Sequence, residues 1–354
     1  RNRQGERIGV IQLINALDEG GNVCAFDRDM ILVLESVASQ AAVTIQNVWY
    51  MEEIETLIQS FVRVMSSAID ERTPYNASHA RHMAEYGGRF VEYLKTCEGQ
   101  KVFSQEEKEE FLMSILLHDI GKLVTPLEVM NKERRLFPEQ HGAIAHRMEV
   151  IRLLAEIDRL AGRITEAEKQ ERTDGTLEAW KLVEEIDSAG FVRDEQLERL
   201  KRLCGRTYRD EQGTVRSWLE PEEYAMLSIR RGTLSEEERG IMEEHVAVTD
   251  RLLSQICFPE KLSHVREWAA AHHELLNGTG YPEHRKGDEI PYEVRMITIL
   301  DIFDSLVADD RPYKRAMPVE RALAILREMA GQEGKLDPEL TELFVKSRCW
   351  EEAP

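Results

Sequence analysis

The sequence predicts a mainly α fold, a helical bundle preceded by a small α/β segment and a long helix. Three observations support this prediction. Residues 22–73 contain neither Gly nor Pro, and apolar residues recur within them at steps of three and four. Nearly all of the chain after Pro74 has helical periodicity. Several of these helices carry a His or Asp on an otherwise apolar face.

Length and composition describe an ordinary globular chain of two or three domains. It has 354 residues, of which 42% are hydrophobic and 32% charged. No apolar run reads as long enough to cross a bilayer, and no signal peptide opens the chain. Because the first residue is Arg1 rather than Met, we expect a fragment whose upstream part, with or without membrane segments, is missing. We expect no direct membrane contact from this fragment.

The net charge limits the classes of binding partner that we expect, and the cysteine pattern indicates the redox compartment. The net charge of −20 argues against binding to a nucleic acid polymer, which needs a basic surface. It leaves room for a small phosphorylated substrate, because bound cations can reverse the local charge. The five cysteines are scattered without C-x-x-C spacing, so a disulfide framework or zinc ribbon is not expected. This pattern fits a reducing cytoplasm.

The first 75 residues read as a small α/β segment at 1–50 and a connecting helix at 51–75. Residues 8–14 are a β-branched run that predicts a short strand, and a turn-rich stretch follows at 18–22. The apolar residues of 31–68 form a narrow seam along one long helix, which suggests a homodimeric coiled coil. The alternative is two shorter helices packed on neighbouring domains, and we favour the single helix.

The remainder reads as helices separated by short breaks. Ser104 with Glu107, and Ser235 with Glu238, form capping boxes that open two helices. Residues 133–232 are charged and helical in pattern, with a turn-rich break at 210–213. The periodicity predicts further helices from Pro291 to Leu306 and from Val319 to Met329, followed by polar C-terminal residues.

Imidazole and carboxylate groups on five predicted helices are the candidate chemistry. They are two adjacent pairs and four single residues: His118-Asp119, His272-His273, His79, His245, Asp301 and Asp304. Each alone is more often a hydrogen-bonded core group or a cap. A buried carboxylate is costly unless it is paired or binds a metal, so together they predict a polyhistidine–carboxylate metal site inside a bundle.

In this order, the residues resemble the HD superfamily of metal-dependent phosphohydrolases, and the fuller strings resemble its HD-GYP branch. The strings are His118-Asp119-Ile120-Gly121-Lys122, His272-His273-Glu274, Gly280-Tyr281-Pro282, residues 301–306 and residues 311–314. The resemblance covers roughly residues 70–132 and 233–345. It implies an HD-type helical bundle at 76–132 and 233–350, interrupted by a helical insertion at 133–232. The segment 1–50 resembles the C-terminal part of a GAF sensor domain.

The resemblance implies an enzyme of bacterial signalling. Family members hydrolyse cyclic di-GMP, and some act on related cyclic dinucleotides, giving linear pGpG or GMP through a metal-bridging hydroxide. Two alternatives remain: another HD-superfamily nucleotide phosphohydrolase, or a catalytically silent module that signals through the long helix.

The resemblance also implies residue roles. Two divalent ions, Fe or Mn with Zn as a further candidate, would share the bridging Asp119. One ion would take His79, His118 and Asp301, and the other would take His245, His272 and His273. Lys122 would stabilise the transition state and Asp304 would orient a ligand or the nucleophile. The expected substrate contacts are Lys122, Gly280, Tyr281, Pro282, Arg311 and Lys314.

The sequence departs from the family pattern at three places. Asn277 stands where an Asp is usual, so a turn hydrogen bond can persist but a charge cannot. Tyr75 stands where some members have a Glu and a third metal, which favours two ions here. The insertion contains His141 and His146, and His146 competes with His245 for one ligand position. We prefer His245 because the residues around it match the family string.

Overall fold

The computed structural model describes residues 8–72, 78–308 and 317–351, and helices dominate them. This confirms the predicted mainly α class. The chain divides into two compact units, Arg1–Met65 and Ser66–Pro354.

The first unit begins with a two-stranded hairpin. Strands β1 (Ala16–Leu17) and β2 (Val23–Cys24) pair antiparallel around the turn-rich stretch at 18–22. The strand predicted over residues 8–14 is wrong, because the described residues 8–15 form no strand. A strand persists only where a neighbour completes its hydrogen bonds, and no described strand pairs with these largely exposed residues.

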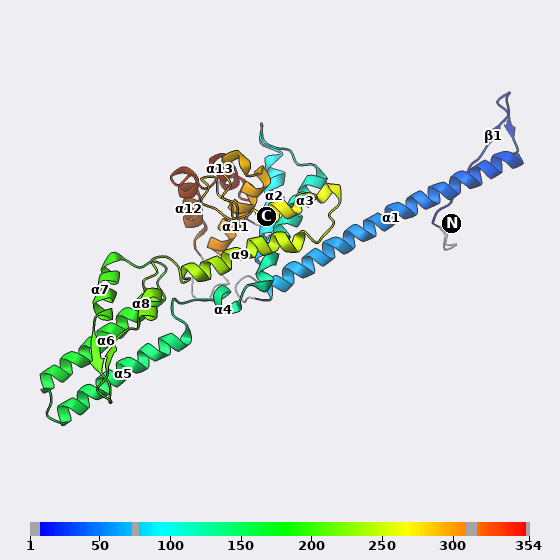
Figure 1. Cartoon of the computed structure of the whole chain (residues 1–354). Coiled ribbons are helices and arrows are strands. Elements are labelled where there is room, and N and C mark those ends of the chain that lie inside the picture. The colour runs from blue at the N-terminus through cyan, green and yellow to red at the C-terminus, as the bar shows by residue number, and fades with distance from the viewer. Residues whose placement is uncertain (1–7, 73–77, 309–316, 352–354) are drawn as a thin grey trace. The chain divides into compact units, whose positions relative to one another are not determined.

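Helix α1 spans Arg28–Asp70 without a break (Figure 1), which confirms one long helix and excludes two shorter ones. Many of its apolar side chains are exposed, among them Val37, Trp49 and Leu57. Contrary to the expectation from the sequence, its stretch Arg28–Ile69 is long and apolar enough to cross a membrane, by length and composition only. Among the described residues it is the one helix that passes this test. The dimeric coiled coil stays a prediction.

The second unit holds the bundle that carries the candidate site residues (Figure 1). Its main helices are α2 (His79–Leu94), α3 (Gln105–Leu117), α9 (Glu236–Leu253), α10 (Val265–Ala270), α11 (Tyr292–Val307), α12 (Val319–Gly331) and α13 (Pro338–Ser347). Shorter turns are η1 (Ile120–Val124), α4 (Leu127–Met130), η2 (Glu260–Leu262) and η3 (Gly287–Glu289). Both predicted capping boxes are present, at the starts of α3 and α9.

The C-terminal residues contribute to the bundle core rather than trailing from it. We expected polar material after residue 329, but α13 places Phe344 between Phe90 and Phe303, at centroid distances of 5.7 and 5.1 Å. All three rings are fully buried. The sequence does carry a signal for this helix, since Asp337 caps it and Pro338 occupies its first position.

Residues 133–232 form a structure with its own core. Its elements are α5 (Pro138–Leu160), α6 (Glu166–Asp187), α7 (Asp194–Cys204), β3 (Thr207–Arg209), β4 (Val215–Ser217) and α8 (Pro221–Leu227). Buried side chains such as Ile144, Val183 and Leu200 form a cluster separate from that of the bundle. The β3–β4 hairpin around the break at 210–213 was not predicted, because three-residue strands are too short to show alternation.

The two ends of this insertion meet. The hydroxyl of Thr233 donates to the carbonyl of Lys132 at 2.8 Å. The ammonium of Lys132 is buried and donates to both carboxylate oxygens of Glu238, on α9, at 2.6 and 2.8 Å. The insertion therefore leaves and re-enters the bundle at one place, next to the helix that carries His245.

Candidate metal centre

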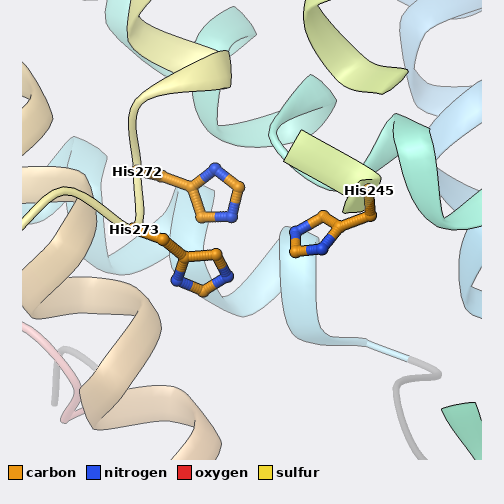
Figure 2. Close-up of side chains that lie close together, drawn as sticks. All are labelled: His245, His272 and His273. Atoms are coloured by element: carbon orange, nitrogen blue, oxygen red, sulfur yellow. The ribbon is translucent and has the colours of Figure 1, made fainter. Parts of the chain in front are cut away.

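The fold brings the predicted ligands together from three helices and two helix ends. His79 opens α2, and His118 and Asp119 lie where α3 gives way to η1. His245 lies on α9, the pair His272-His273 follows α10, and Asp301 lies on α11. His118 and His272 are fully buried, and His79, Asp119 and His245 are nearly so. Figure 2 shows His245 facing the ring pair of His272 and His273.

Three histidines are held by the same local device. The Nδ1 atoms of His118, His245 and His272 lie 2.6, 2.6 and 2.7 Å from the carbonyl oxygens of Ile115, Met242 and Ala269. Each carbonyl belongs to the residue three positions earlier. A carbonyl can only accept, so Nδ1 carries the proton and Nε2 presents its lone pair. Backbone geometry thus fixes both the tautomer and the direction of each ligand atom.

The Asp119 carboxylate lies between the histidines. Its Oδ1 is 3.4 Å from Nε2 of His245 and 3.8 Å from Nε2 of His272. Its Oδ2 is 3.3 Å from Nε2 of His118 and 2.5 Å from Nζ of Lys122. The two oxygens therefore face two different groups of ligand atoms, which is the placement that a bridging carboxylate requires.

Asp301 and Asp304 hold the remaining histidines. His79 lies between them, with Nε2 3.2 Å from Asp301 Oδ1 and Nδ1 2.7 Å from Asp304 Oδ2. His273 Nδ1 is 3.6 Å from Asp301 Oδ2. Asp304 thus orients His79 from behind. His82 Nδ1 lies 3.6 Å from the other Asp304 oxygen.

Several buried polar atoms of the cluster lack a hydrogen-bond partner, and this bears on whether a metal fits here. Nε2 of His118, His245 and His272, and Oδ1 of Asp119, are buried without a hydrogen-bond partner. Such atoms are costly unless something binds them. Ligand atoms of His79, His118 and Asp119 lie within 4.8 Å of one another, as do those of His245, His272 and His273. The residues present therefore fit the binding of divalent metal.

The protonation states also suit metal binding. Burial lowers the pKa of His245 and His272, and lowers that of His273 to about 4, so these rings are neutral ligands at pH 7. Burial opposes ionisation of Asp119, but its interactions with His118 and with the Lys122 ammonium hold its pKa well below the ordinary value. His79 differs: burial lowers its pKa, yet Asp301 and Asp304 raise it to about 10. It carries an extra proton in the metal-free protein.

The loop after the His pair packs tightly against it. A Cβ at Gly280 would lie 2.3 Å from the Leu275 nitrogen and 2.4 Å from the His273 carbonyl oxygen, so only glycine fits. The ring of Tyr281 lies 4.8 Å from that of His273. Asn277 keeps the turn bond that we expected, since its side-chain oxygen accepts from Thr279 N at 3.0 Å.

Contacts that the sequence did not suggest hold η1 in place. The Thr249 hydroxyl, on α9, accepts from Gly121 N and donates to the His118 carbonyl, both at 3.0 Å. The guanidinium of Arg72 donates to the carbonyl oxygens of Lys122 and Thr125 at 2.6 and 3.1 Å. Their sequence separation, 128 residues for Gly121 and Thr249, leaves no pattern that could have paired them.

The remaining candidates fall outside the cluster or outside the described residues. His146 is exposed on α5, and His141 pairs with Glu184 at 2.6 Å within the insertion. His245, and not His146, thus lies in the cluster, and its role as a ligand stays a prediction. Arg311, Lys314 and Tyr75 lie outside the described residues.

Part of the chain is similar in sequence to known proteins. The model of the HD domain family matches residues 218–340. A 3'3'-cGAMP-specific phosphodiesterase 3 of Vibrio cholerae is 45% identical over 97 residues, which is 27% of this chain and 20% of that protein. A cyclic di-GMP phosphodiesterase of Thermotoga maritima is 39% identical over 119 residues, 33% of this chain and 31% of that protein. The response regulator RpfG of Xanthomonas campestris, a cyclic di-GMP phosphodiesterase, is 35% identical over 124 residues, 34% and 31% of the two chains. The chain thus spans about a fifth to a third of the length of these relatives.

Proposed function

We propose that this chain is a metal-dependent phosphodiesterase that hydrolyses cyclic di-GMP or a related cyclic dinucleotide to linear pGpG or GMP. The observation that carries the proposal is the set of buried, unpartnered Nε2 atoms directed at the two faces of Asp119. The names of the relatives supply the substrate class, and they include both cyclic di-GMP and 3'3'-cGAMP. The substrate panel below separates these two.

In this proposal two divalent ions share Asp119. His79, His118 and Asp301 complete one ligand set, and His245, His272 and His273 complete the other, with Fe or Mn favoured and Zn a candidate. Two such metal ions would activate water at neutral pH and neutralise charge on the phosphoryl oxygens.

The protein's own groups position the reacting parts. Lys122 places a positive charge beside Asp119, where it would meet the phosphate and stabilise charge in the transition state. Asp304 keeps His79 in one orientation through its bond to Nδ1. Gly280 and Pro282 shape the loop that brings the Tyr281 ring beside His273, where a base could stack on it. Water adds across one P–O bond, and the leaving sugar oxygen takes a proton.

The test combines metal content with hydrolysis of a substrate panel. The wild-type chain should contain Fe, Mn or Zn and should release linear dinucleotide from cyclic di-GMP, 3'3'-cGAMP or both. His118→Ala should lose metal and activity, whereas His146→Ala, an exposed histidine of the insertion, should change neither. Hydrolysis of common nucleotides with none of cyclic dinucleotides would favour another HD-superfamily phosphohydrolase. Loss of neither metal nor activity in His118→Ala would refute the proposal.

Three further parts of the proposal concern context. The exposed apolar side chains of α1 support a homodimer formed through that helix. The residues 9–15 and the helix after Phe26 support a GAF-type origin for residues 1–50, from sequence alone. The free cysteines support a cytoplasmic location.

A further inference from the structure

A groove on the insertion, between α6 and α7, is lined by three arginines. The three are Arg199, Arg202 and Arg206, at steps of three and four. Arg199 and Arg202 share one face of α7, and Arg206 follows just after the end of that helix. The opposite wall is the face of α6 that carries Gly175 and Ala179. These small residues leave a half-open cavity of about 280 Å³.

These arginines form no ion pair within the described part of the chain. No carboxylate among the described residues forms an ion pair with Arg199, Arg202 or Arg206. Other arginines of the insertion do pair: Arg147 with Glu223 at 2.7 Å and Arg172 with Asp158 at 3.1 Å. In a chain of net charge −20, three unpaired guanidinium groups around one cavity are unusual. The one acidic residue of the lining, Glu178, makes no ion pair with them.

Arg206 is also held in place. Its guanidinium lies over the ring of Trp218, 5.1 Å from the centroid. A Cβ at residue 175 would lie 2.8 Å from its Nη1, so the guanidinium occupies the space that glycine leaves open. Gly175 lies inside α6, where glycine is otherwise unfavourable, and this contact accounts for it. The cation–π contact with Trp218 leaves the N–H donors of the guanidinium available.

We propose that this groove binds a small phosphate-bearing molecule, between pyrophosphate and a mononucleotide in size. A guanidinium presents paired donors that match phosphate oxygens, and three of them can neutralise a multiply charged group. The groove lies on the surface of the insertion, and none of its lining residues belongs to the metal centre, so it is a second site. Binding of such a molecule in the groove would make the insertion a ligand-binding part of the chain.

Binding is measured by titration calorimetry of the full chain with sodium pyrophosphate and, separately, GMP. The chain carries the His118→Ala substitution, so that ions of the catalytic centre do not bind the probe. We expect saturable binding that Arg202→Ala weakens at least tenfold, because one charge-assisted contact is lost. Arg163→Ala removes the same charge from the insertion outside the groove, where Arg163 pairs with Asp158, and should leave affinity within twofold.

Gly175→Ala is the sharper variant. It favours helix formation in α6, and the atom that it meets is the tip of a flexible side chain, so the protein should stay folded. It nevertheless pushes the Arg206 guanidinium out of its place, and we expect affinity for pyrophosphate to fall at least tenfold. Absence of binding at millimolar pyrophosphate and GMP, equal loss in Arg163→Ala, or equal affinity for sulfate would overturn the proposal. Unchanged affinity in a folded Gly175→Ala chain would also overturn it.

Discussion

Gly121 is the closest point between η1 and α9, and we predict that Gly121→Ala forces them apart. A Cβ at this position would lie 1.8 Å from the carbonyl oxygen of His245 and 2.8 Å from the nitrogen of Thr249. Both atoms are backbone atoms of a packed helix, so no side-chain rotation can relieve the contact. The substitution therefore acts on the spacing of two segments that each carry site residues.

The size of the displacement follows from these contacts. The Cβ–oxygen distance must grow from 1.8 Å to at least 3.0 Å, the shortest contact that real Cβ atoms show. Asp119 and His245 lie on the two segments and are 3.4 Å apart. A misplacement of about 1 Å costs on the order of 100-fold in rate. Overpacking costs about 1–3 kcal/mol of unfolding free energy, and a backbone clash belongs at the upper end.

Three measurements check this prediction: metal content, the hydrolysis rate for cyclic di-GMP, and the denaturant midpoint. The matched control is Gly240→Ala, because Gly240 is exposed on the same helix and has nothing within 4 Å of an added Cβ. The control should gain about 1 kcal/mol from helix propensity and keep its metal and rate. A Gly121→Ala chain with wild-type metal content and rate would show that the reasoning is wrong.

Four other predictions concern the same unit. Because the pKa of His79 is raised from 6.5 to about 10, metal must displace a proton from it, and apparent metal affinity should fall about tenfold for each pH unit below 10. Calorimetry in different buffers measures the proton released on binding. Metal affinity that does not depend on pH would contradict this prediction. In the metal-free protein the same shift stabilises the fold fully below pH 6.5, and this contribution should disappear as pH rises through about 10. Arg72→Ala should lower the free energy of unfolding by about 1–3 kcal/mol and slow hydrolysis, because η1 loses two hydrogen bonds. Arg72→Lys should have an intermediate effect. Thermal unfolding and rate assays measure both effects, and an Arg72→Ala chain that behaves like wild type would contradict the prediction. Replacing residues 135–231 by a short Gly-Ser linker should preserve metal content, since the ends already meet; loss of metal would show that the insertion supports the site.

Sequence reasoning found the helices and ligands for which a local pattern exists. The steps of three and four along α1 and α2 follow directly from one apolar face, so these helices were predictable. The pairs His118-Asp119 and His272-His273 stand out as dipeptides, and their order along the chain identified the rest. The bridging role of Asp119 is expected only through a resemblance and stays a prediction; in the structure its two oxygens face different histidines.

The contacts that sequence reasoning missed are those that depend on tertiary packing. The carbonyl bonds that fix Nδ1 of three histidines depend on ring rotamers, which no residue pattern specifies. Thr249 and Arg72 act on η1 across long stretches of sequence. The run at 8–14 has strand composition without a partner, so intrinsic preference alone was a poor guide there. The tail helix α13 was missed because its polar outer face dominated the composition.

The predicted ligands of the candidate metal centre are spread from residue 79 to residue 301, and this has a consequence for biosynthesis. While the chain is being made, His79, His118 and Asp119 leave the ribosome long before α9, α10 and α11 exist to face them. The nascent chain therefore has no complete cage for ions until the residues through Asp301 have been translated. A product that stops before residue 301 would expose the early histidines to the cytosol with no enclosed site to protect any ion they capture.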